Sequence, residues 1–457
     1  MSRRLSSSTH FFKVRQARDK LEEAAREHAS TSSNRTVNRD VVVGLRGELS
    51  DEAIAKIAPS SSFTRVFQKR RQEIREQRGD SQANVRDANL FDIPARFQNL
   101  TIGNTAGMLF SSWFSYENVF ADRFLIADIN IEEEGLRACI FMSPFGVNIV
   151  ERFRTIAFDG TFFLAPSHMY QLFTVHAFID GKASLPVAYA VMNSKTFEMY
   201  QHVFRIIDSQ LAPNRKPLKS MSDFERASFS AARAVWPSMD VSLCQFHFGQ
   251  SLYRYIQSKE ELKARYKQEP DRIAMRSCQA LSFIPVGNIY STFCLLWDTT
   301  EGLDRYFDYF FRTYITSNVV PPTPLPHSRA DQRIRQVLLP QGGQGATFAP
   351  EEWNMATRVL EGDPRTTNAL EGWHQIINKY ISAKPTLTKL LELVLDEEKR
   401  AREVYREYEI NPAKGLRQIL PRVEVRRHEL QLRTIVETWN PAGDSLQYLR
   451  RVTYHLA

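Results

Sequence analysis

Apolar and polar positions are most regularly spaced between residues 151 and 249, where they predict strands alternating with helices. Two apolar runs flank Asp180-Gly181-Lys182, and Asp-Gly between such runs is a strong hairpin signal. Apolar residues at helical spacing follow, after a candidate helix cap at Thr196. The pattern predicts strand, strand, strand, helix, strand, helix and strand at Thr155–Phe163, Gln171–Ile179, Ala183–Met192, 197–211, Leu218–Ser222, Arg226–Val235 and Val241–Phe246.

This order of elements predicts an α/β (mixed α+β) fold with an RNase H-like core, in which the first and fourth strands lie side by side. After Phe248 the apolar spacing becomes helical, which predicts a mostly helical insertion before the next motif. Prolines and glycines in 317–350 predict a long loop within it. We expect four regions: a polar, helical and candidate DNA-facing region at 1–150, the first part of the core at 151–249, the helical insertion at 250–365, and a helical region with Glu371 at 366–457.

Three carboxylates occupy informative places in this pattern. Asp159 closes the first predicted strand, Asp223 closes the fourth, and Glu371 lies on a helix far downstream. Hard divalent ions such as Mg²⁺ or Mn²⁺ prefer oxygen ligands, and two such ions can clamp both oxygens of a phosphodiester displacement. Each acid alone has an ordinary explanation: a turn at Asp159-Gly160, a helix N-cap at Asp223, or a surface glutamate at Glu371. The strand order favours the metal site, because it brings the two aspartates together.

The helix predicted around Glu371 has two distinct faces. Its apolar face is expected to comprise Leu370, Trp373, Ile377 and Tyr380. Glu371, His374, Gln375 and Asn378 are expected on a separate polar face. His374 is therefore a candidate partner that orients an acidic ligand.

Several short motifs together strongly resemble the Mutator-like element (MULE) transposase domain. They are Phe158-Asp159-Gly160-Thr161-Phe162, the hairpin, Ser222-Asp223-Phe224-Glu225, Cys244-Gln245-Phe246-His247-Phe248 and Thr367-Asn368-x-x-Glu371. The resemblance covers about residues 150–375. It implies an RNase H-like fold with a helical insertion and a DDE site at Asp159, Asp223 and Glu371, the residues expected to hold Mg²⁺ or Mn²⁺. It also implies that Cys244 and His247 form the family's C/D-x-x-H motif.

Cys244 and His247 allow two interpretations. Their spacing fits half of a zinc site, but no distal Cys/His pair of suitable spacing completes it, so zinc is not expected. The alternative is that both residues end a strand and pack beside the acids. Relatives often carry an N-terminal zinc-binding DNA module, and this chain has no cysteine before Cys139. That difference puts sequence-specific recognition of DNA ends in question.

Charge and composition agree with a nucleic-acid partner without requiring one. The chain has 457 residues, 60 basic and 52 acidic, with a net charge of +8. Six basic residues lie within 63–78, which is either a solvated helix or a DNA-facing one, and the candidate DNA contacts there are Arg65, Lys69, Arg70 and Arg71. Four scattered cysteines indicate a reducing compartment. No signal peptide and no membrane span are expected.

The sequence therefore favours a Mutator-like DDE transposase that cleaves DNA and transfers the freed strand. Its expected partners are transposon ends, target DNA and further copies of itself, and its expected location is the nucleus. A domesticated DNA-binding or regulatory protein that keeps the fold without transposing is the alternative. A cellular RNase H-type nuclease is disfavoured by the long insertion and by the motif of Cys244 and His247.

Overall fold

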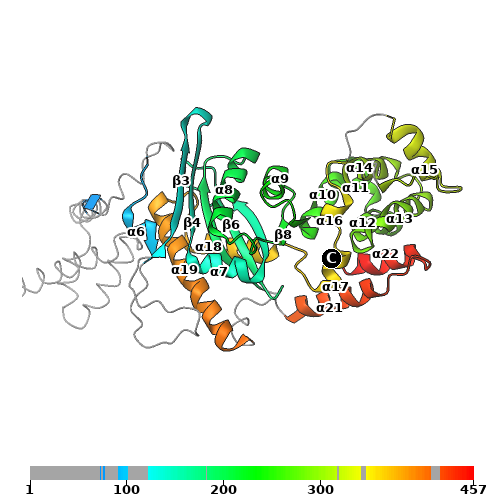
Figure 1. Cartoon of the computed structure of the whole chain (residues 1–457). Helices are drawn as coiled ribbons and strands as arrows, with labels where there is room; N and C mark the ends of the chain where they lie inside the picture. Colours follow the sequence, from blue (N-terminus) through cyan, green and yellow to red (C-terminus); the bar gives the residue numbers. More distant parts are fainter. Residues whose placement is uncertain are drawn as a thin grey trace, which may run out of the picture.

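A seven-stranded mixed sheet with its covering helices forms one lobe of the molecule, and packed helices form the other (Figure 1). The computed structural model describes residues 91–100, 122–181, 183–315, 319–340, 346–412 and 423–456, with positions 73, 76 and 77. Of the helices in these ranges, none is apolar over enough residues to cross a membrane. The candidate DNA contacts Arg65, Lys69, Arg70 and Arg71 lie outside them.

The strands lie in the order β3-β4-β7-β6-β5-β8-β9. The last three run parallel to one another, and each of the other neighbouring pairs is antiparallel. The predicted neighbours, the first and fourth strands of the RNase H-like pattern, are β5 and β8 and are confirmed. The sheet comprises β3 (Leu125–Ile131), β4 (Leu136–Met142), β5 (Thr155–Thr161), β6 (Gln171–Ile179), β7 (Ala183–Met192), β8 (Lys219–Ser222) and β9 (Asp240–Leu243). A two-stranded ladder joins β1 (Asn99–Leu100) to β2 (Asp122–Arg123).

Helices cover both faces of the sheet, so β4 and β6 are buried along their whole length. Alternate residues of β4 enter opposite cores: Ile140 belongs to the core that includes α8 and α9, and Phe141 belongs to the core that includes the start of α19. The helices of this lobe are α6 (Ala95–Gln98), α7 (Pro144–Phe153), α8 (Phe197–Gln210), α9 (Arg226–Val235), α18 (Asn368–Tyr380) and α19 (Leu387–Ile410). A 3₁₀ turn, η1 (Glu132–Glu134), joins β3 to β4.

The β6–β7 hairpin turns at Asp180 and Gly181, as their sequence predicted. Both adopt positive φ, at 50° and 64°, which a tight turn between twisted strands requires. The Tyr408 hydroxyl donates to Oδ2 of Asp180 at 2.6 Å, so α19 holds the hairpin in place.

The helical lobe has an aromatic core and contains both the segment between β9 and α18 and the end of the chain. Leu432 of α21 and Leu449 of α22 are fully buried against its helices (Figure 1). Its helices are α10 (Gln245–Gln257), α11 (Glu260–Arg265), α12 (Glu269–Ala280), α13 (Val286–Asp298), α14 (Asp304–Tyr314), α15 (Arg329–Arg333), α16 (Pro350–Trp353), α17 (Ala356–Glu361), α21 (Val423–Glu437) and α22 (Ser445–Tyr454). The shorter turns are 3₁₀ η2 (Leu281–Phe283) and π-helical η4 (Ile334–Leu338).

Three local predictions were wrong. The strand predicted at Val241–Phe246 ends at Leu243, and α10 begins at Gln245. The predicted loop at 317–350 contains α15 and η4, because Ala330, Ile334 and Leu338 pack into the aromatic core. On α18, Tyr380 is 77% exposed rather than part of the apolar face, whereas His374 is buried beside that face.

Candidate active site

Asp159 lies two residues before the end of β5, and Asp223 directly follows β8. The parallel register pairs Phe158 with Ser222, so the next residue on each strand places the two aspartates side by side. Neighbouring strands are about 4.8 Å apart, and paired residues point to the same face of a sheet. The sheet topology therefore brings together two carboxylates that are 64 residues apart in the sequence.

The two aspartates are held by few hydrogen-bond donors. Oδ1 of Asp159 accepts from the backbone N–H of Gly160 at 2.8 Å, and Oδ1 of Asp223 accepts from that of Glu225 at 3.1 Å. Burial, followed by the negative charge of Asp159, raises the pKa of Asp223 to about 6. The pair thus concentrates negative charge that the protein itself does not fully neutralise.

The start of α10 fixes the chain that leads into α18. The backbone N–H of Gln245 donates to the carbonyl of Arg365 at 2.9 Å. The N–H of Thr367 donates to Sγ of Cys244 at 3.3 Å. These two bonds anchor the residues just before Asn368, the first residue of α18. They explain how an acid more than 140 residues after Asp223 reaches the same region.

Glu371 faces His247 across this junction. Nε2 of His247 lies 3.4 Å from Oε1 of Glu371. The same Oε1 is buried and accepts no hydrogen bond, so the contact is electrostatic rather than a well-directed bond. His247 also lowers the pKa of Asp223, which shows that it acts on both acids. Glu371 therefore contacts His247, whose charge also acts on Asp223.

His374, one helical turn after Glu371, contacts the other aspartate. Its Nδ1 lies 3.5 Å from Oδ2 of Asp159, and its Nε2 lies 3.3 Å from the hydroxyl of Thr174. Thr174 is the cross-strand partner of Asp159 on β6. The Thr174 hydroxyl donates to the backbone carbonyl of Asp159 at 3.4 Å, and its oxygen remains able to accept from Nε2 of His374. His374 therefore attaches α18 to β5 beside Asp159. The sequence pattern placed it on a separate polar face of the helix, as a candidate partner of an acidic ligand.

Cys244 and His247 form a coupled pair at the N-terminus of α10. Burial lowers the pKa of His247, but Cys244, Glu371 and Asp223 outweigh burial and raise it to about 9. Burial raises the pKa of the Cys244 thiol, but His247 and the N–H of Thr367 outweigh burial and lower it. Cys244 is fully buried, so a substrate does not reach it. Its role in this geometry is to bind the amide that precedes the Glu371 helix.

A divalent ion fits the chemistry of these donors. Asp159, Asp223 and Glu371 supply carboxylate oxygens, one of them buried without a hydrogen bond, and Asp223 lacks a cationic partner at salt-bridge distance among the described residues. Within the described ranges, no three His, Cys, Asp or Glu side chains are already grouped as a metal site. In this structure Glu371 is turned toward His247, so it must reorient to join the aspartates around a shared ion.

The sequence patterns missed Glu225 and the side chains around it. The Tyr200 hydroxyl donates to Oε2 of Glu225 at 3.1 Å and accepts from Nε2 of Gln171 at 2.7 Å. Burial raises the pKa of Glu225, Lys195 lowers it, and Asp159 raises it further. A Cβ atom built on Gly160 would lie 2.1 Å from Oε1 of Gln171, so glycine lets this side chain pass beside Asp159. In the sequence, the signal that could have pointed to Glu225 is its position two residues after Asp223.

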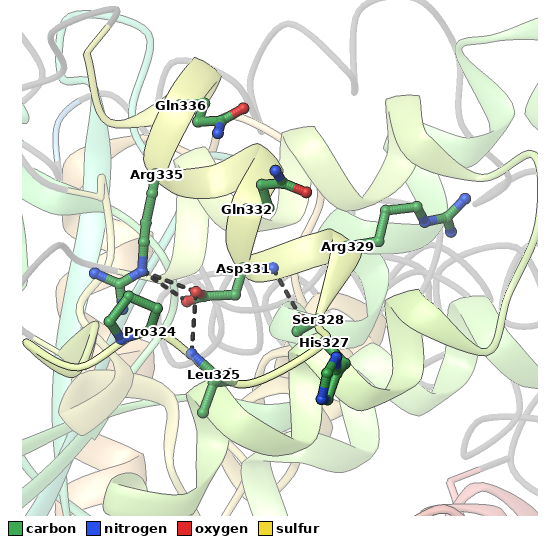
Figure 2. A pocket seen from close by; sticks show the side chains of 9 residues that line it. All are labelled: Pro324, Leu325, His327, Ser328, Arg329, Asp331, Gln332, Arg335 and Gln336. Atoms are coloured by element: carbon green, nitrogen blue, oxygen red, sulfur yellow. Dashed lines mark hydrogen bonds and ion pairs between the residues drawn. The ribbon is translucent and has the colours of Figure 1, made fainter.

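A hollow in the helical lobe offers a different environment. It measures about 430 Å³ and lies beside α15, where Figure 2 shows Asp331 facing Arg335 and Leu325. Arg335 donates to both oxygens of Asp331, at 3.0 and 2.8 Å, and the Leu325 N–H donates at 3.1 Å. Asp331 and Arg335 thus satisfy each other, and the hollow contains none of the site residues predicted from the sequence.

Comparison with known families identifies one match. Residues 155–251 match the model of the MULE transposase domain, which confirms the family resemblance over this range. The matched range includes Asp159, Asp223, Cys244 and His247, whereas Glu371 lies outside it. No curated protein matches the chain. The match supports a transposase-related function, and a transposase domain implies a DNA partner.

Proposed function

We propose that the protein is a DDE transposase of the Mutator-like type, with Asp159, Asp223 and Glu371 as its metal-binding catalytic residues. The observation that carries the proposal is the pair of incompletely neutralised aspartates at the ends of two parallel strands. A carboxylate with a raised pKa and few partners, such as Asp223, is typical of a functional site, since the same charge would destabilise a purely structural position. Glu371 would complete the triad from α18.

In this mechanism the other residues of the chain hold the three metal-binding acids in position. Gly160 and His374 hold Asp159, the N–H of Glu225 holds Asp223, and the junction with α10 holds the Glu371 helix. Bound Mg²⁺ or Mn²⁺ would neutralise the phosphate, activate the attacking oxygen and stabilise the leaving one. Positioning of the reacting groups would supply the rest of the rate acceleration. No covalent intermediate with the enzyme is needed. The proposal implies action in the nucleus and assembly of several copies on paired DNA ends.

A cleavage and strand-transfer assay tests this function directly. The substrate is DNA bearing the inverted repeats that flank the gene, with Mg²⁺ or Mn²⁺. Asp159→Asn keeps the side chain's shape but removes its charge, so cleavage should fall by at least about a thousandfold. Binding to DNA, measured in EDTA, should be largely unchanged. The matched control is Glu133→Gln, an exposed acid in the η1 turn, which should cleave as the original protein does.

The domesticated DNA-binding protein is the second candidate, and one observation favours it. Glu371 is paired with His247 instead of being grouped with the aspartates. If the unaltered protein binds DNA but cleaves no substrate with any divalent ion, this second function replaces the first. If Asp159→Asn cleaves as well as the unaltered protein, the assigned site is wrong.

Arg65, Lys69, Arg70 and Arg71 remain proposed DNA contacts. A cation that meets a phosphate releases counterions, so each contact adds about 0.9 to the slope of log affinity against log salt. Neutralising all four should flatten the slope by up to about four units and weaken binding to all DNA sequences alike. An unchanged slope would remove these residues from the DNA interface.

A further inference from the structure

Two aromatic side chains are exposed beside the candidate active site. Phe162 lies three residues after Asp159 and is 51% exposed, and Tyr170 directly precedes β6 and is 42% exposed. Their ring centroids are 5.1 Å apart, with the rings nearly perpendicular. A single exposed aromatic residue needs no explanation, but two in contact form a defined apolar surface. This surface borders the strand end that holds the candidate metal ligand.

A lysine completes the group. Nζ of Lys195 lies 5.7 Å from the ring centroid of Phe162 and 5.8 Å from that of Tyr170. Lys195 is exposed in the segment between β7 and α8. Among the described residues it forms no salt bridge with any acid. Its charge is therefore available to an anion that approaches the rings, and we name Phe162, Tyr170 and Lys195 the aromatic platform.

The pairing of β5 with β6 relates the aromatic platform to the acids. Asp159 pairs with Thr174 and Thr161 pairs with Leu172, so Phe162 and Tyr170 lie just beyond the ladder that holds Asp159. The residue after Tyr170 is Gln171, which passes beside Gly160 and donates to Tyr200. The platform thus belongs to the rim of the active site and is separate from its metal ligands. A substrate phosphate bound at the acids would place neighbouring nucleotides at the rings.

We propose that the aromatic platform binds an unpaired base of the DNA next to the bond that is cut. Every base has a flat π-face that stacks on an aromatic ring, and a lysine attracts the adjoining phosphate. Stacking of this kind favours frayed, mismatched or single-stranded nucleotides over a fully paired duplex. The proposal rests on DNA being the substrate of the proposed function, but binding at the platform does not require cleavage.

Binding measured in EDTA tests the platform independently of catalysis. The probes are a fully paired 30-base-pair duplex and the same duplex with three central unpaired bases, and the readout is fluorescence anisotropy. The double variant Phe162→Ala, Tyr170→Ala should bind the second probe between about fivefold and a hundredfold more weakly, with little change for the first. Tyr253→Ala, Tyr454→Ala, which removes two exposed rings from the helical lobe, is the matched control and should bind both probes normally.

A base analogue locates the contact. With 2-aminopurine at the unpaired position, binding to the unaltered protein should quench its fluorescence, and the double variant should lose that quenching. Phe162→Trp should retain it, while Lys195→Gln should weaken binding without abolishing quenching. The proposal is overturned if the platform and control variants lose affinity equally, or if the platform variant loses affinity for both probes alike. It is also overturned if 2-aminopurine is still quenched when the two rings are absent. These binding and quenching results do not depend on cleavage. They hold whether Asp159→Asn abolishes cleavage or the unaltered protein cleaves no DNA at all.

Discussion

Asp223 in the sheet lobe and Asp331 in the helical lobe are carboxylates in contrasting surroundings, the first partly exposed and the second buried. Asp331 is 2% exposed and accepts hydrogen bonds from Arg335, Tyr290 and the Leu325 N–H. Burial raises its pKa, but Arg335 and Tyr290 outweigh burial and lower it. Asp223 accepts one backbone bond and lies beside Asp159, and its pKa is raised. The first acid stabilises its lobe, whereas the second destabilises the fold unless a cation joins it.

Removing the charge of Asp331 should produce the larger change in stability. Asp331→Asn leaves Arg335 without its anionic partner, so the free energy of unfolding should fall by about 3 kcal/mol. Urea denaturation measures this loss. Glu301→Gln, an exposed acid in the same lobe, is the control and should change stability little. An Asp331→Asn protein as stable as the control would show that the network around α15 is not a structural anchor.

Removing the charge of Asp223 should instead stabilise the protein. In EDTA at pH 7, Asp223→Asn should raise the free energy of unfolding by about 2 kcal/mol, because repulsion from Asp159 and the burial of a charge are relieved. Glu133→Gln is the control. Saturating Mn²⁺ should stabilise the unaltered protein and have little effect on the variant. A destabilised Asp223→Asn protein would contradict the contrast between the two acids.

The increase in the free energy of unfolding caused by Asp223→Asn should grow as the pH rises. Asp223 has a pKa of about 6 when folded, above its ordinary value of 3.8, so the folded protein binds this proton more tightly. Below about pH 4 the Asp223 carboxyl is protonated in both the folded and the unfolded protein and does not lower stability. As the pH rises through about 6, the folded carboxyl ionises and the protein loses stability. The stability difference between variant and unaltered protein should therefore be near zero at pH 4 and full above pH 6. A difference that is constant with pH would assign the effect to another cause.

The sequence predicted the strand order because apolar runs and the Asp180-Gly181 turn are local signals. It also placed Asp159 and Asp223 together, since one topological rule makes β5 and β8 neighbours. It did not predict β3 and β4 individually, because the region before residue 150 lacks comparably clear turn signals. The strand end at Leu243 was misjudged because Cys244 and Phe246 are apolar enough to continue a strand pattern.

The details of the site depended on contacts that a sequence pattern does not contain. His374 is polar, yet it is buried because its two ring nitrogens face Asp159 and Thr174. Cys244 reads as a strand-end core residue until the Thr367 amide is seen to point at its sulfur. Phe162 extends an apolar strand pattern, and only the structure shows that β5 has ended and left the ring exposed. Tertiary contacts decided each of these three positions.

The most direct measurement of the central claim is anomalous diffraction at the manganese edge, from crystals of the full chain bound to DNA and soaked in Mn²⁺. The account predicts manganese within about 2.5 Å of carboxylate oxygens of Asp159 and Asp223, with Glu371 turned from His247 to join them. No such density at Asp223 should remain in Asp223→Asn. Manganese bound only at other acids, or none at the aspartate pair in the presence of DNA, would contradict the account.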